Sequence, residues 1–376
     1  MISLLVSLCF AVNSVSPVSA YDVFALQGGN NIMDEEHFGI INGLATMGVN
    51  YKDVAALSGF WAPPYVSSDF SLEVRLFSEN IPTTHYVWRP FEVLREGVIH
   101  DIKVNAASLL PYGFRAGILA ITLENTSNAD LNVPLDITLR GTLDKAVTWE
   151  FSRTLSQTPA PAAIFGHGLI KPQKDCVLVV QTDENILSWN AEASSGSCTF
   201  PLKAGGQKTF HLITAMGDAT SSTAVQTLLA NPAQQIEQSR AEYNRRVEDI
   251  FAKLPRLSSD NPALEPFYNR SLVHFITNRW ETPEFVLRPY YGTGCIKGGC
   301  VCNYLWNFGE VWEILPLYDP EAAREHIKQF LKIDITQHFA FLPITGEAFG
   351  PWYMVNQEKI IGLIYYYVKN TGDTAF

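Results

Sequence analysis

Two short segments in the second half of the chain concentrate polar, charged and aromatic side chains. The first is YLWNFGEVWEI (residues 304–314), and the second is FLPITGEAFGPWYMVNQEKI (residues 341–360). Aromatic faces can pack against the C–H surface of a sugar ring, while amides and carboxylates bind its hydroxyl groups. If both segments lie on the same side of consecutive helix pairs, their side chains converge on one pocket. This combination predicts a carbohydrate-binding site.

Trp306 and Trp352 are the candidates for stacking on a sugar, and core packing is the alternative role of each. Arg288 precedes two tyrosines and could clamp a carboxylate or a pair of hydroxyl groups, with a structural ion pair as its alternative role. We expect no cofactor and no metal, because the histidines lack a metal-binding spacing and the cysteines at 295–302 lack a partner pair.

Cleavage of a glycosidic bond needs two carboxyl groups, of which one protonates the leaving oxygen and the other activates water or attacks the sugar. Three glutamates in or near the two segments are the internal candidates, namely Glu310, Glu347 and Glu358. Each has a structural alternative, such as a solvated helix position or, for Glu358, an interaction with a helix dipole. Asp319, which precedes a proline, is expected to cap a helix.

The order of the predicted domains and these two segments resemble the (α/α)6 six-hairpin glycosidases, especially glycoside hydrolase families 63 and 37. In that superfamily an aromatic-Trp-Asp motif opens an early barrel helix and contacts the sugar beside the cleaved bond, and Leu305-Trp306-Asn307 matches its position. A later loop carries Pro and aromatic residues ahead of a Gln at a helix start, and this chain has Leu342-Pro343, Trp352-Tyr353 and Gln357 there. The resemblance covers about residues 285–376.

The resemblance implies a glycoside hydrolase, generally an inverting one, that acts on an oligosaccharide or glycoside, with α-gluco or α-manno types preferred. In these families both catalytic carboxylates come from later hairpins, so we expect them beyond Phe376 and expect this chain alone to be inactive. Two departures, Asn307 for the usual Asp and Glu358 where a proline pair usually follows the Gln, imply a different sugar or a weakened site. The resemblance assigns substrate binding to five residues: Trp306, Asn307, Trp352, Tyr353 and Gln357.

Three other functions stay open at this point: a non-catalytic carbohydrate-binding protein, a polysaccharide lyase and a glycoside phosphorylase. Lyases of related architecture place the helical toroid before the sheets and use Tyr or His with Arg, whereas here the sheets come first and neither segment contains His. A phosphorylase needs a phosphate pocket, and the chain has no Gly-rich phosphate loop or basic cluster. The hydrolase is therefore the preferred hypothesis.

Period-two alternation dominates from Tyr21 to about Asp218. In DFSLEVRLF and VPLDITLRG apolar residues alternate with polar ones, which is typical of strands with one face on a core and one in water. Further strands are predicted at 117–124, 176–181 and 210–215. No segment between them suits a crossover helix, so we expect antiparallel sheets in a large, supersandwich-like β-sandwich over residues 21–218.

Helical periodicity takes over near Thr220, with a helical linker at 219–260 and the N-terminal part of an (α/α)6 barrel at 261–376. Six helical hairpins need well over about 300 residues, and about 160 follow the sandwich. The barrel is therefore expected to be incomplete. Helices are predicted after Asn231-Pro232, from 261 to about 280, from 303 to about 315, after Asp319-Pro320, and from 356 to 369.

Charge and the N-terminal residues predict an exported, soluble protein without a nucleic-acid partner, in addition to the carbohydrate partner that the two segments and the resemblance imply. The formal net charge is −11 with scattered Lys and Arg, which disfavours phosphate backbones and anionic lipid. Residues 1–20 carry a short apolar run ahead of small residues, so we expect a signal peptide and a secreted or periplasmic protein. No other stretch is apolar for long enough to span a bilayer.

Five cysteines remain once the signal peptide is removed. Cys176 and Cys198 flank a strand-rich stretch and could pair with each other in an oxidising compartment. A local disulfide with a spare thiol is expected among Cys295, Cys300 and Cys302. Two sequences also fit the N-glycosylation motif, namely Asn125-Thr126-Ser127 and Asn269-Arg270-Ser271.

Overall fold

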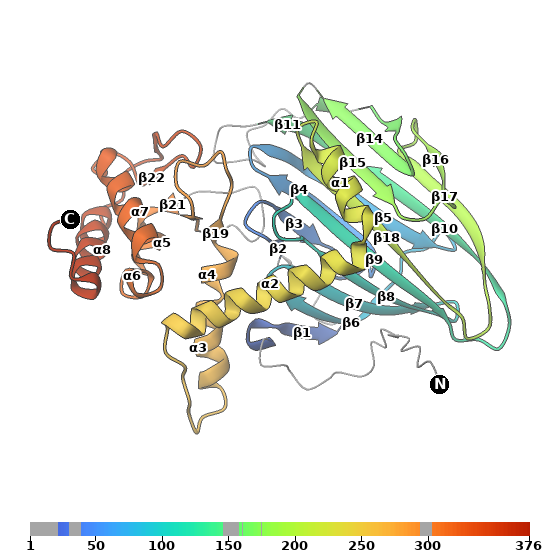
Figure 1. Cartoon of the computed structure of the whole chain (residues 1–376), viewed down its shortest axis with the longest axis horizontal. Coiled ribbons are helices and arrows are strands. Elements are labelled where there is room, and N and C mark those ends of the chain that lie inside the picture. The colour runs from blue at the N-terminus through green and yellow to red at the C-terminus, as the bar shows by residue number, and fades with distance from the viewer. Residues whose placement is uncertain (1–21, 30–38, 146–157, 160, 174, 294–302) are drawn as a thin grey trace, which may run out of the picture.

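The computed structural model describes residues 22–29, 39–145, 158–159, 161–173, 175–293 and 303–376. Up to Gly217 the chain forms two large β-sheets, and from Ser221 onward helices predominate (Figure 1). The expectation of antiparallel sheets followed by a helical part is therefore confirmed. The predicted signal peptide and the cysteines at 295, 300 and 302 lie outside the described residues.

The first sheet is antiparallel and has nine strands in the described part of the chain. It follows a short 3-10 helix at Asp22–Phe24. In spatial order the strands are β1 (Leu26–Gly29), β6 (Thr83–Arg89), β7 (Glu92–Ile99), β8 (Ile102–Leu109), β9 (Ala116–Asn125), β18 (Gln207–Gly217), β15 (Cys176–Thr182), β14 (Gly168–Gln173) and β13 (Ala163–Ile164).

The second sheet packs against the first. Its main path is β16 (Ser188–Asn190), β17 (Ser195–Leu202), β10 (Leu131–Arg140), β5 (Tyr65–Leu76), β4 (Ala56–Ala62), β3 (Thr46–Val49) and β2 (Ile40–Ile41). A side branch pairs β11 (Thr142–Lys145) with β5 and with β12 (Thr158–Pro159). A Cβ atom added at Gly117 of the first sheet would meet the Met47 methyl group of the second at 2.8 Å, so the inner faces of the sheets are in direct contact there.

The predicted alternation matches the observed strand faces. On β10, Val133, Leu135, Ile137 and Leu139 are all buried, while the polar residues between them are partly exposed. β5 repeats this pattern from Phe70 to Leu76. Because successive side chains of a strand point to opposite faces, one set of apolar residues on each sheet builds the shared core.

Helices α1 (Ser221–Ala230) and α2 (Pro232–Lys253) cover part of the outer face of the first sheet (Figure 1). The Asn231 side chain accepts a hydrogen bond from the Gln234 N–H at 3.1 Å, which confirms the predicted cap. Arg240 of α2 forms an ion pair of 2.5 Å with the buried Glu92 carboxylate of β7. The predicted linker is therefore packed onto the sandwich.

The remaining chain alternates short strands with helices. None of the helices in the described part of the chain is both long and apolar enough to cross a bilayer. The elements are α3 (Leu264–Leu272), α4 (His274–Thr277), β19 (Arg279–Trp280), β20 (Tyr290–Tyr291), β21 (Asn303–Tyr304), α5 (Leu305–Gly309), α6 (Leu315–Tyr318), α7 (Pro320–Lys332), β22 (Ala340–Phe341), β23 (Ala348–Phe349) and α8 (Asn356–Thr371).

Two predicted helices are wrong in extent. The segment from 303 to 315 is a two-residue strand, the short helix α5, a turn and then α6. Its first residues pair with β22, and Pro316 at the start of α6 lacks the N–H that a continuous helix would need. The segment from 261 to 280 breaks at Val273 and ends in β19.

The suggested Cys176–Cys198 disulfide is wrong, because both thiols are free. Cys176 lies on β15, next to the residue paired with Gly217 at the end of β18. Cys198 lies on β17 in the other sheet, where burial raises the pKa of its thiol and the nearby charge of Lys208, close to the start of β18, opposes that shift. The two ends of β18 are roughly 30 Å apart at the usual rise per residue, which is beyond the reach of a disulfide.

Neither glycosylation motif presents an accessible asparagine. Asn125 is fully buried, and its side-chain amide donates hydrogen bonds to the Ala129 carbonyl at 2.8 Å and the Leu202 carbonyl at 3.1 Å. Asn269 is 8% exposed on α3. Both asparagines that match the glycosylation motif are therefore buried in the fold.

His326 lies at the centre of the helical part and is fully buried. The Tyr291 backbone N–H donates to its Nε2 at 3.0 Å, and its Nδ1 lies 2.8 Å from the Ala322 carbonyl oxygen. A backbone N–H can only donate and a carbonyl can only accept, so the ring is neutral and protonated on Nδ1. Burial lowers the pKa of His326 to about 4.

This predicts a pH-dependent stability. As the pH falls from about 6.5 to 4, the histidine of the unfolded chain takes up a proton that the folded chain excludes, so the free energy of unfolding decreases. Between pH 7 and pH 5 the wild type should lose roughly 2 kcal/mol more than the His326→Gln variant. Urea unfolding at both pH values measures this difference. The exposed His167→Gln variant should follow the wild type, and parallel pH dependence of wild type and His326→Gln would contradict the argument.

Candidate functional site

A small three-stranded sheet brings the two polar and aromatic segments together. Asn303 and Tyr304 of β21 pair with Phe341 and Ala340 of β22, and β22 pairs in turn with β23. The N–H of Leu305 donates to the Phe339 carbonyl at 2.8 Å, which joins the start of α5 to the same sheet. The start of α5 and the loop before α8 are therefore neighbours.

Four aromatic residues from the two segments and Phe339, which lies just before the second segment, form one cluster, which we call the aromatic platform: Tyr304, Trp306, Phe339, Phe349 and Tyr353. The Tyr304 and Phe339 rings stack with centroids 4.7 Å apart, and Tyr353 lies 5.1 Å from Phe339. Trp306 meets Tyr353 edge to face at 5.9 Å. Phe339 is 5% exposed, whereas Trp306 and Tyr353 are 47% and 40% exposed. The platform thus has a buried base and an open aromatic surface.

Trp352 is 46% exposed and adjoins Tyr353 of the platform. Neither Trp306 nor Trp352 is sealed inside a core, so both predicted tryptophans present ring surface from adjoining segments. Asn307 is exposed beside Trp306, and Gln357 is half-buried in the first turn of α8.

Arg288 is exposed in the loop between β19 and β20. This loop is attached to the second segment, because the N–H of Val286 donates to the Pro343 carbonyl at 2.8 Å. Arg288 therefore lies two residues from a direct contact with the segment that carries Trp352.

The three candidate glutamates have different surroundings. Glu310 forms an ion pair of 2.8 Å with Lys359 of α8. Glu347 is exposed and accepts a hydrogen bond from the Thr345 hydroxyl at 3.2 Å, and Glu358 is exposed in the first turn of α8. Of the three, Glu310 is the one that lines the cleft described next.

A cleft of about 540 Å³ opens between α4 and α5. Sequence analysis singled out Asn307 and Glu310 in its wall but missed the residues supplied by α4 and by the end of β20, which carry no local motif. Tyr304 belongs to both the cleft and the aromatic platform. The lining residues are His274, Phe275, Asn278, Tyr291, Gly292, Thr293, Tyr304, Asn307, Phe308, Glu310, Val311 and Leu315.

Close packing of α5 on α8 supports one wall of this cleft. A Cβ atom at Gly309 would lie 2.6 Å from the Lys359 side chain, and one at Gly362 would lie 2.0 Å from the Trp312 ring. The Lys359 ammonium in turn sits 4.6 Å from the centre of the Trp312 ring. Both glycines are therefore needed for the close approach of the two helices.

Buried side-chain amides hold the loops of the site. Asn356, fully buried at the start of α8, donates to the carbonyl oxygens of Ile335 and His338, both at 3.0 Å. Asn303 donates to the Tyr291 carbonyl at 2.8 Å. The carbonyls of Ile335 and His338 lie outside helices and strands, so the Asn356 amide supplies partners that no regular element provides, while Asn303 ties β21 to β20.

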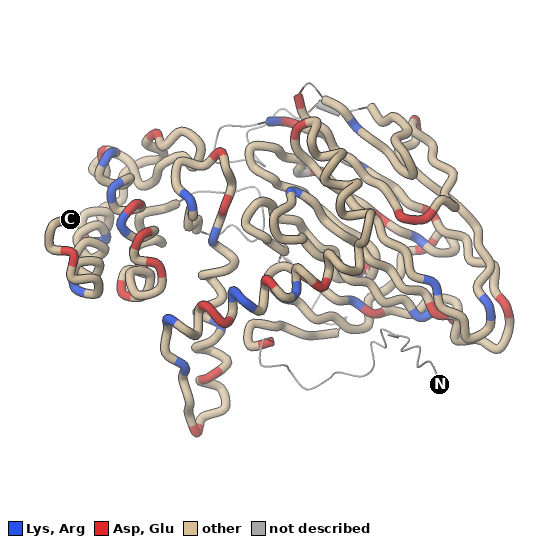
Figure 2. Tube along the Cα trace, in the orientation of Figure 1, with Lys and Arg blue, Asp and Glu red and all other residues tan. Residues whose placement is uncertain are grey.

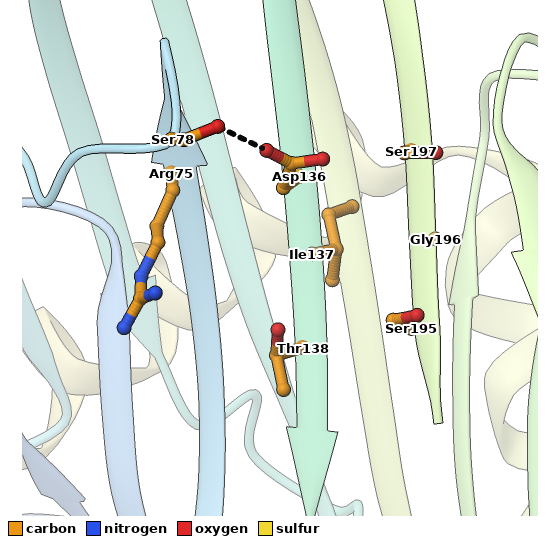
Figure 3. Close-up of a pocket in the computed structure, with 8 residues that line it drawn as sticks. All are labelled: Arg75, Ser78, Asp136, Ile137, Thr138, Ser195, Gly196 and Ser197. Carbon is orange, nitrogen blue, oxygen red and sulfur yellow. Dashed lines mark hydrogen bonds between the residues drawn. The ribbon is translucent and has the colours of Figure 1, made fainter. Parts of the chain in front are cut away.

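A second hollow, of about 360 Å³, lies on the outer face of the second sheet (Figure 3). Its wall is polar, and within it the Ser78 hydroxyl donates to the Asp136 carboxylate at 3.3 Å. No aromatic side chain is among its lining residues, which distinguishes it from the platform and cleft: Arg75, Ser78, Asp136, Ile137, Thr138, Ser195, Gly196 and Ser197.

Charged residues are spread over the described part of the chain. Figure 2 shows acidic and basic residues interspersed along both the sandwich and the helices. Within the described ranges, no group of three or more His, Cys, Asp or Glu side chains is placed to hold a metal ion. The site as described therefore offers aromatic surface and hydrogen-bonding groups.

Two solved structures resemble this chain over nearly its whole length. A proposed kojibiose phosphorylase from the human microbiome aligns with a TM-score of 0.63 and 11% identity over 94% of this chain and 57% of that protein. A bacterial glucoamylase in complex with acarbose aligns with a TM-score of 0.50 and 8% identity over 92% of this chain and 59% of the glucoamylase. This chain shares their fold.

The expected glycosidase-type fold is thus confirmed as a fold, while the assignment to families 63 and 37 stays a prediction. The chain spans less than two thirds of the length of either structure. Neither the protein-family models nor the curated proteins include a match to this sequence.

The loop that carries Phe349 and Tyr353 of the platform contains a glycine whose substitution we expect to destabilise the protein. Gly350 has φ +74°, and a Cβ atom there would lie 2.1 Å from the Phe339 ring. Gly350→Ala should therefore combine backbone strain with a clash against the platform and destabilise the protein by about 2–4 kcal/mol. Urea unfolding measures this loss. Gly113→Ala is the matched control, because Gly113 has φ +85° with nothing within 4 Å, and equal losses in both variants would contradict the clash.

Proposed function

We propose that this chain is the N-terminal part of a glycoside hydrolase of the six-hairpin (α/α)6 type, acting on an oligosaccharide or glycoside. The observation that carries the proposal is the contact of Trp306 with Tyr353, which joins two segments distant in sequence into one open aromatic surface. Contact of a group of apolar ring surfaces with water is unfavourable, so such a surface commonly marks a binding site. The flat faces of aromatic rings suit the C–H faces of sugar rings.

The proposed roles follow from chemistry and exposure. Trp306, Trp352 and Tyr353 stack on sugar rings, since each is 40–47% exposed. Asn307 and Gln357 bind hydroxyl groups through amides that both donate and accept hydrogen bonds, and Arg288 binds a hydroxyl pair or a carboxylate.

The catalytic carboxylates are proposed to lie in helices that follow this chain. Exposed apolar residues on α8 and α6 support further packing there, since Ile361, Tyr365 and Leu317 are 66%, 58% and 50% exposed. The solved structures with the same fold are also longer than this chain. An inverting enzyme would hold its two carboxyl groups about 6.5–9.5 Å apart across the bound sugar. We further propose that residues 1–20 direct export.

A glycoside phosphorylase is the second candidate, because the structure that aligns with a TM-score of 0.63 carries that name. The lining of the cleft, within the described residues, includes neither Lys nor Arg, and a phosphate ion would need such donors. The resemblance of residues 285–376 to glycoside hydrolase families favours the hydrolase. Release of sugar that requires inorganic phosphate would instead support the phosphorylase.

The proposal predicts binding on the platform. Trp306→Ala and Tyr353→Ala should each weaken binding to an array of oligosaccharides by about five- to tenfold, because loss of one aromatic stack costs about 1–1.5 kcal/mol. Tyr365→Ala is the control, since Tyr365 is an exposed aromatic residue on α8 outside the platform.

Unchanged binding in both platform variants, or an equal loss in the control, would contradict the proposal. Hydrolysis of an array sugar by this chain alone would contradict the placement of the catalytic pair beyond Phe376.

A further inference from the structure

The cleft between α4 and α5 adjoins the aromatic platform and differs from it in chemistry. Its floor is apolar and well packed, with Phe275, Phe308 and Leu315 at 5%, 2% and 1% exposure. Polar groups stand at the mouth, where Asn307 and Glu310 are exposed. An apolar floor with a few polar groups at the rim is the usual make-up of a site for a small organic group.

Among the described residues, the lining of the cleft does not favour an ionic ligand. Glu310 is the one carboxylate among the described lining residues, and that lining includes no Lys or Arg. The Glu310 carboxylate is already paired with Lys359 at 2.8 Å, and the Lys359 ammonium also faces the Trp312 ring. The Glu310 carboxylate is thus already neutralised within the described lining, and an uncharged group fits this environment.

Two residues connect the cleft to the platform. Tyr304 lines the cleft and stacks on Phe339, the buried base of the platform. Asn307 lines the cleft and follows Trp306 directly in α5. One molecule can therefore contact both surfaces if it carries a sugar at one end and an apolar group at the other.

Building on the proposed function, we propose that the cleft binds the apolar aglycone of a glycoside whose sugar lies on the aromatic platform. The volume of 540 Å³ is suited to an alkyl chain of several carbons or an aryl group, since small-molecule pockets span about 300–1,000 Å³. The substrate class is thus an uncharged alkyl or aryl glycoside, in which both ends of the molecule contribute to binding.

Titration calorimetry with methyl and hexyl glycosides of glucose, mannose and galactose, in both anomers, tests the inference. At least one hexyl glycoside should bind about tenfold or more tightly than its methyl counterpart, because five added methylene groups leave water. Val311→Asp should abolish this advantage, and the milder Val311→Thr should reduce it. Ile314→Asp, a substitution at an exposed apolar residue in the same turn that does not line the cleft, should preserve it.

The second part of the test uses Trp306→Ala. This variant should weaken the binding of the methyl and hexyl glycosides by the same factor. Three results would overturn the inference: hexyl and methyl affinities that are equal for every pair, a hexyl advantage that survives both Val311 variants, or hexyl binding that is indifferent to Trp306→Ala. A change in sedimentation of Val311→Asp without a change in glycoside affinity would assign the cleft to a polypeptide and also overturn it.

The failure of the inference and that of the proposed function are distinguishable. If sugars bind on the platform and the alkyl chain adds nothing, only the aglycone assignment fails. If neither glycosides nor oligosaccharides bind, the carbohydrate function fails with it.

Discussion

The site depends on buried side chains that supply hydrogen bonds to loops with almost no regular structure. The strands β20 to β23 contain two residues each, so most of the neighbouring backbone has no ladder partner. His326, Asn303 and Asn356 provide the missing bonds, and all three are buried. An unpaired backbone group in such an interior costs about 1–3 kcal/mol, so these contacts select one path for each loop. Trp306, Tyr353 and the cleft wall are positioned by that choice.

A second set of contacts ties this framework to the sandwich. Arg246 of α2 reaches Glu281 at 3.2 Å and lies 4.3 Å from the centre of the Tyr112 ring, which belongs to the turn between β8 and β9. The N–H of Glu281 also donates to the Gly43 carbonyl at 2.8 Å. These bonds anchor the stretch from β19 to β20, whose end forms one side of the cleft, so the sandwich contributes to the site by holding that stretch in place.

Sequence patterns predicted the sheets well because strand alternation is a local property. The buried residues of β5 and β10 could be assigned from alternation alone. Capping by Asn231 and Asp319 was equally local, and both side chains accept the expected backbone hydrogen bonds. The break in the helix predicted at 303–315 was not visible, because it comes from the pairing of Asn303 with Phe341 across the fold.

The candidate site was predicted in part for the same reason. Trp306 and Tyr353 lie in segments with an unusual composition, and composition can be seen without knowing the fold. His274 and Asn278 line the cleft only because α4 passes beside α5, and nothing in their neighbours along the chain indicates this. The supporting roles of Asn303 and Asn356 likewise depend on carbonyl groups brought near by folding. Contacts of this kind can be identified only from the folded structure.

The central claim is that sugars bind to the surface formed by Trp306, Trp352 and Tyr353. The most direct measurement follows the indole N–H signals of ¹⁵N-labelled protein in NMR spectra during titration with α-linked gluco- and manno-disaccharides. The signals of Trp306 and Trp352 should shift together with one affinity, while that of Trp280, which is fully buried, should stay in place. Constant Trp306 and Trp352 signals, with shifts at another tryptophan such as Trp189, would contradict the account.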